Sequence, residues 1–72
     1  MKTSDSKAMY YLGMLFESGL RVDMNTDIAL LWYKKSYSNG YTFALNKLYA
    51  FYSNPNNKFF STKIADFYLN LL

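Results

Sequence analysis

The fold is decided between residues 8 and 19, where the sequence reads AMYYLGMLFESG. Apolar side chains recur there at intervals of three and four residues, the spacing of one helix face. These residues are Ala8, Tyr11, Leu12, Leu15 and Phe16. Ser4 or Asp5 supplies a cap before this pattern, and Gly19 is a residue type that ends helices. We therefore predict a first helix over residues 5–18.

Three later segments show the same helical period, over residues 26–39, 41–53 and 62–71. Asn25 is an N-cap for the first of them, and Asn39-Gly40 ends it. Residues 54–57, Asn-Pro-Asn-Asn, form a turn cluster before a cap at Ser61 or Thr62. The predicted inward positions are Ala29, Trp32, Tyr33 and Ser36, then Ala44, Leu45, Leu48, Phe51 and Tyr52, then Ile64, Ala65, Tyr68 and Leu69.

The two halves of the chain are related by a shift of 36 residues without a gap. Ala8 then falls on Ala44 and Leu12 on Leu48, and the identical positions are small or apolar. We therefore predict one all-α domain over residues 1–72, built from two tandem antiparallel helical hairpins. The first repeat covers about residues 5–40 and the second about residues 41–72.

The pattern over residues 8–44 resembles the Sel-one-like repeat (SLR) family, which is related to the tetratricopeptide repeats. The residues that carry the resemblance and its continuation are Ala8, Leu12, Gly13, Phe16, Gly19, Ala29, Trp32, Tyr33, Gly40, Ala44, Leu48 and Ala65. The resemblance implies a scaffold that serves as an adaptor or as a regulator that holds other proteins, and it places Trp32 in the hairpin core. Arg21 departs from the pattern, because the family has a glycine in this part of its loop, and arginine adopts a left-handed conformation poorly.

Composition excludes most enzyme chemistry. The chain contains no His and no Cys, so the most common general base and the best nucleophile are missing. The five carboxylates are scattered and show no calcium-loop spacing: Asp5, Glu17, Asp23, Asp27 and Asp66. We therefore predict that the chain is not an enzyme and binds no metal or cofactor.

Two surface patterns indicate a protein partner. Leu31 and Phe67 occupy equivalent positions of the two repeats, at a site that is usually charged in the family. Residues 67–72, FYLNLL, give the last repeat an apolar rather than a polar outer face. We predict a protein–protein interaction module, either an adaptor or a small inhibitor, that contacts another protein or a second copy through this C-terminal face. The predicted contact residues are Tyr10, Met14, Leu31, Phe67, Leu71 and Leu72.

Two alternatives stay open. The net charge of +3 and the tyrosines Tyr10, Tyr11, Tyr41, Tyr49 and Tyr52 suit a nucleic-acid-associated protein that stacks bases. However, the lysines are spaced out and form no basic stripe. The helical spacing of the tyrosines favours a role for their rings in the core. The second alternative is that the chain is a truncated piece of a longer repeat array. The sequence shows no apolar run long enough to span a membrane and no signal peptide, which favours a cytoplasmic location.

Overall fold

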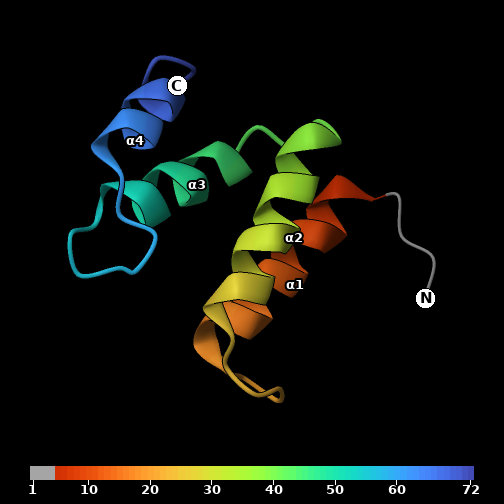
Figure 1. Ribbon diagram of the computed structural model, residues 1–72. Helices are drawn as coiled ribbons and strands as arrows, with labels where there is room; N and C mark the ends of the chain where they lie inside the picture. Colours follow the sequence, from red (N-terminus) through yellow and green to blue (C-terminus); the bar gives the residue numbers. More distant parts are fainter. Residues whose placement is uncertain (1–4) are drawn as a thin grey trace.

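The computed structural model describes residues 5–72, which form an all-α arrangement of four helices (Figure 1). The helices are α1 (Ser6–Ser18), α2 (Thr26–Ser38), α3 (Ala44–Ser53) and α4 (Thr62–Leu69). Each helix packs against the next one, α1 on α2, α2 on α3 and α3 on α4. The predicted fold class is therefore confirmed, with α1 and α2 as one hairpin and α3 and α4 as the other.

Local sequence sets most of the helix ends. Asp5 caps α1 by accepting a hydrogen bond from the backbone N–H of Lys7, and Asn25 caps α2 in the same manner. Ser61 caps α4, as predicted. Gly19 closes α1 in the left-handed conformation at φ 74°, which its missing Cβ permits. Ser4, the other predicted cap of α1, lies outside the described residues.

The start of α1 and the end of α2 each differ by one residue from the predicted bounds, and two other bounds are wrong by more. The third helix begins at Ala44 rather than at residue 41, because Phe43 at its N-cap position makes no side-chain hydrogen bond. Residues 41–43 form a tighter turn instead, in which the Ala44 N–H donates to the Tyr41 carbonyl at 3.1 Å. The fourth helix ends at Leu69 rather than at residue 71, because the last two residues also form turns of this tighter type.

The core lies where α2 meets α1 and α3. Its fully buried side chains are Tyr33, Leu48 and Ser36, and the Ser36 hydroxyl donates to the Ser6 carbonyl at 2.6 Å. All five predicted inward positions of α3 are buried. The fold is thin, 34 × 26 × 12 Å along its principal axes, so few residues lie far from solvent.

The predicted inner face of α1 is rotated from the observed one. Met9 and Gly13 are the buried residues of this helix, whereas Tyr11 is 51% exposed. Helices approach most closely where a side chain is smallest, so Gly13 rather than Leu12 lies at the centre of the contact with α2. Ala8, Leu12, Leu15 and Phe16 are only partly buried: they flank that centre.

The prediction that Trp32 is a core residue is also wrong. Its ring is partly exposed, and the ammonium of Lys35 lies 5.3 Å from the ring centroid. Leu30 is buried instead, together with Ala29, Tyr33 and Ser36. Since the Tyr33 ring lies against Gly13 of α1, its neighbour Trp32, about 100° further around α2, lies away from the centre of that contact.

The last helix is the least covered. Ala65 is its one buried residue, and Tyr68 is partly buried. Ile64 and Leu69, which were predicted to point inward, are 40% and 48% exposed. The reason is that α4 makes extensive contact with α3 alone, at the end of the chain opposite to α1 (Figure 1).

Candidate functional site

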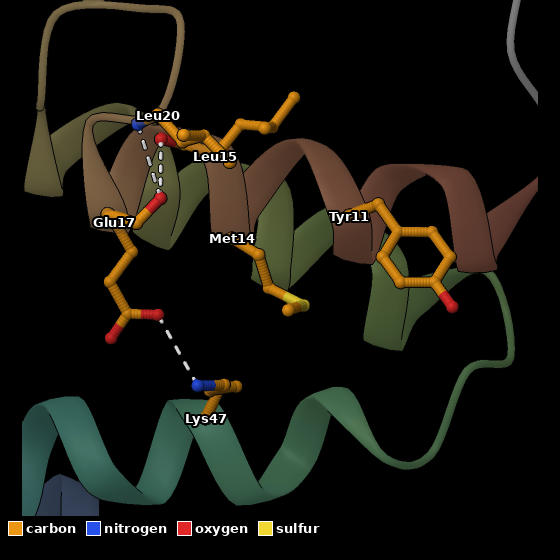
Figure 2. Close-up of a pocket in the computed structure, with 7 residues that line it drawn as sticks. Tyr11, Met14, Leu15, Glu17, Leu20 and Lys47 are labelled. Carbon is orange, nitrogen blue, oxygen red and sulfur yellow. Dashed lines mark hydrogen bonds and ion pairs between the residues drawn. The ribbon is translucent and has the colours of Figure 1, made fainter.

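A first groove lies between α1 and α3, and we call it the α1–α3 groove (Figure 2). Its lining is mostly apolar, and its volume is about 400 Å³. The lining residues are Tyr11, Met14, Leu15, Glu17, Ser18, Leu20 and Lys47. Of its large apolar side chains, Tyr11, Met14 and Leu20 are 51%, 39% and 62% exposed.

The charged groups of the α1–α3 groove are paired with one another. The Lys47 ammonium lies 3.4 Å from Glu17 Oε1, as the dashed line in Figure 2 shows. The Tyr33 hydroxyl donates to the same carboxylate oxygen at 2.6 Å. Burial raises the pKa of Tyr33, and the hydrogen bond to Glu17 and the negative charge of that carboxylate raise it further. These contacts tie α1 to α2 and α3, so they stabilise the fold.

A second groove, which we call the α2–α4 groove, lies between α2 and α4, with a residue of α3 at its base. Its lining residues are Lys34, Tyr37 and Ser38 of α2, Leu48 of α3, Phe67 and Tyr68 of α4, and Leu71. Leu48 is only 1% exposed, so it forms the base of the groove. The volume, about 520 Å³, is in the range of binding sites in proteins.

The wall that α4 contributes carries a stripe of exposed apolar side chains. Ile64 and Phe67 lie three residues apart on one face of α4, and Leu71 follows in the turn after the helix, where it lines the groove together with Phe67. They are 40%, 60% and 47% exposed. We call these three residues the α4 stripe. No element of residues 5–72 covers it.

The opposite wall carries a cation. Lys34 lies with its ammonium 5.7 Å from the centroid of the Tyr52 ring, which itself stacks on Tyr68 at 5.7 Å between centroids. Burial raises the pKa of Tyr68. Among residues 5–72 the ion pairs are Lys47 with Glu17 and Lys58 with Asp27, so Lys34 takes part in neither.

The structure brings only some of the predicted contact residues together. Phe67 and Leu71 share the α2–α4 groove, whereas Leu31, 53% exposed and one helical turn before Lys34 on α2, does not line it. Met14 lies in the other groove. Leu72 is 58% exposed but lines neither.

Tyr10 does not fit the prediction of a contact residue. Its ring packs inside the fold, 5.4 Å from the Tyr33 ring and 5.1 Å from the Tyr41 ring between centroids. Tyr52 is buried and Tyr49 packs against the core, so of the five tyrosines considered for base stacking only Tyr11 is largely exposed. The sequence analysis did not predict Tyr11 and Leu20 as groove residues. Tyr11 was missed because the helical period placed its ring on the inward face of the first helix.

The described residues hold no close group of three or more acidic side chains that could bind a metal ion. No helix within residues 5–72 has both the length and the apolar character needed to cross a membrane.

Comparison of the chain with profiles of known protein families, with curated proteins and with solved structures finds no match. The likeness to the SLR family therefore rests on the sequence pattern of residues 8–44. The functional argument rests on the two grooves.

Proposed function

We propose that the chain is a protein–protein interaction module that binds its partner through the α4 stripe and the α2–α4 groove. The observation that supports this is the stripe itself: three apolar side chains, each at least 40% exposed, on α4 and the turn that follows it, where the helix packs extensively against one neighbour only. Exposed apolar residues are ordinary when they are single, whereas a contiguous row beside a groove is typical of an interface.

The energetics are adequate for such a contact. Covering a few hundred Å² of apolar surface contributes several kcal/mol at about 25 cal/mol per Å². The costs of association and of ordering side chains reduce that gain, so the binding depends on how completely the partner fills the groove. A partner that covers only the stripe therefore binds weakly.

The contact can be tested with the labelled chain in an extract of its native host, by analytical ultracentrifugation with fluorescence detection. The wild-type chain is expected to sediment as a complex. Phe67→Lys combined with Leu71→Lys is expected to sediment as a free chain with unchanged circular dichroism, because it buries unpaired charge in the contact.

The matched control is Met14→Lys combined with Leu20→Lys, which adds the same charge to the α1–α3 groove. This variant should keep the complex. A wild-type chain that sediments alone, or a Phe67/Leu71 variant that stays in the complex, would argue against the proposal.

A further inference from the structure

We infer that the segment bound in the α2–α4 groove is an amphipathic helix of another protein, with acidic residues beside its apolar face. This inference rests on the proposed function and names the chemistry of the partner. It draws on three features of the groove, namely its walls, its cations and its lack of carboxylates.

The shape of the groove suits a helix. Two helices form its walls and Leu48 forms its base, while Phe67 and Leu71 lie along one wall at a spacing of four residues. An incoming helix presents side chains at i, i+3, i+4 and i+7 on one face, and these match such a row. Tyr37 and Tyr68 add aromatic surface to the two walls.

The charges beside the groove are positive. Lys34 lines the α2 wall, and Lys63 lies one turn before Phe67 on α4, outside the residues that line the groove. Neither lysine belongs to either of the two ion pairs of residues 5–72. No Asp or Glu lines the groove.

Neither Asp27 nor Asp66 forms an ion pair with Lys34 or Lys63. Asp27 of α2 is paired with Lys58 at 2.8 Å. Asp66 of α4 lies three residues after Lys63, on a neighbouring part of the helix surface, but it belongs to neither of the two ion pairs of residues 5–72. Acidic residues on the bound helix would therefore meet Lys34 and Lys63, which makes the two surfaces complementary.

A second copy of the chain fits the groove less well. Each copy carries a net charge of +3, and none of the four helices of residues 5–72 contains more than one carboxylate. Pairing two copies would bring lysines together.

The probe is a yeast-displayed library of helical peptides of about 18 residues, long enough for marginal helicity. Leucines are fixed at i, i+3, i+4 and i+7, and the flanking positions vary among Glu, Lys and Gln. Selection on the wild-type chain should enrich Glu at the flanks, whereas selection on Lys34→Glu with Lys63→Glu should enrich Lys. A selected acidic peptide should bind this variant about tenfold more weakly than the wild type.

The matched control is Lys7→Glu with Lys35→Glu, which changes the net charge equally at positions outside the groove and should leave affinity within about twofold. Binding must also be lost in Phe67→Lys with Leu71→Lys. Enrichment of Lys or Gln on the wild type, or an absence of peptides that depend on Phe67, overturns the inference. So does a dimer of the purified chain at micromolar concentration by light scattering. In each of these cases the proposed function still stands if the Phe67-dependent complex forms with another protein in extract, and it fails if that complex is absent.

Discussion

Gly13 of α1 lies directly against the ring of Tyr33 of α2. A Cβ atom built on Gly13 would be 2.7 Å from Cε1 and 2.8 Å from Cδ1 of that ring. The ring is fully buried, and its hydroxyl continues to Glu17, one turn after Gly13 on the same helix. The first hairpin therefore depends on the absence of a side chain at Gly13.

Gly13→Ala should lower the free energy of unfolding by about 1–2 kcal/mol, although alanine favours helices by about 1 kcal/mol over glycine. The loss follows from the overlap with a buried ring that has no room to move. Urea denaturation measures it. In a Tyr33→Leu background the smaller side chain leaves space, so the same substitution should cost less or stabilise. Equal losses in both backgrounds would show that the contact is not limiting.

Tyr33→Phe removes the hydrogen bond to Glu17 and should cost about 1 kcal/mol at neutral pH. Burial raises the pKa of Tyr33 above its ordinary value of 10, so above pH 10 the unfolded chain loses a proton that the folded chain retains. The free energy of unfolding should therefore fall as pH rises past 10, by up to about 1.4 kcal/mol per pH unit from this group.

The Tyr33→Phe variant lacks the loss of stability that comes from ionisation of the Tyr33 hydroxyl, while Tyr68 titrates in both proteins. The stability difference between wild type and Tyr33→Phe should thus be constant up to about pH 9, shrink above pH 10 and reach zero before about pH 11. Denaturation curves at several pH values provide the comparison. A difference that stays constant to pH 11 would contradict the burial of this hydroxyl.

Arg21 has φ 66°, the one non-glycine residue among residues 5–72 with a positive φ. This conformation costs an L-residue about 1–2 kcal/mol, and glycine avoids that strain at a smaller cost in chain entropy. Arg21→Gly should raise the free energy of unfolding by about 0.5–1 kcal/mol, while Arg21→Lys should leave it unchanged. Thermal melts of both variants test this, and a destabilised glycine variant would refute it.

Trp32 and Tyr33 are neighbours in sequence with different burial. Trp32→Ala should cost about 1–2 kcal/mol, whereas Tyr33→Ala should cost about 3–5 kcal/mol and approach the stability of the domain. Trp32 is the single tryptophan of the chain, so the quenching of tryptophan fluorescence by acrylamide measures the exposure of this side chain alone. Full protection from quenching, or the reverse order of stability losses, would disagree with the structure.

The helices follow from residue types that act locally. Asn25 and Ser61 cap, Gly19 ends a helix, and the apolar row of α3 points inward as its period predicts. The start of α3 was missed because no polar cap precedes it. The phase of α1 was missed because Gly13 has no hydrophobicity that a pattern can register, although its small size decides the packing.

The candidate site follows from sequence only in part. Phe67 and Leu71 stand out because apolar residues end the second repeat without a polar outer face. The α2–α4 groove also needs Leu48 as a base and Tyr37 as a wall. These residues line one groove with Phe67 only because α3 packs against both α2 and α4, which depends on the tertiary fold.

Photo-cross-linking tests the proposed interface most directly. A benzoylphenylalanine placed at position 67 and activated in the native host should cross-link one partner protein. The same group at Ala50, an exposed position of α3 outside both grooves, should not. A partner captured only from position 14, or equal products from positions 67 and 50, would contradict the assignment of the α4 stripe as the binding surface.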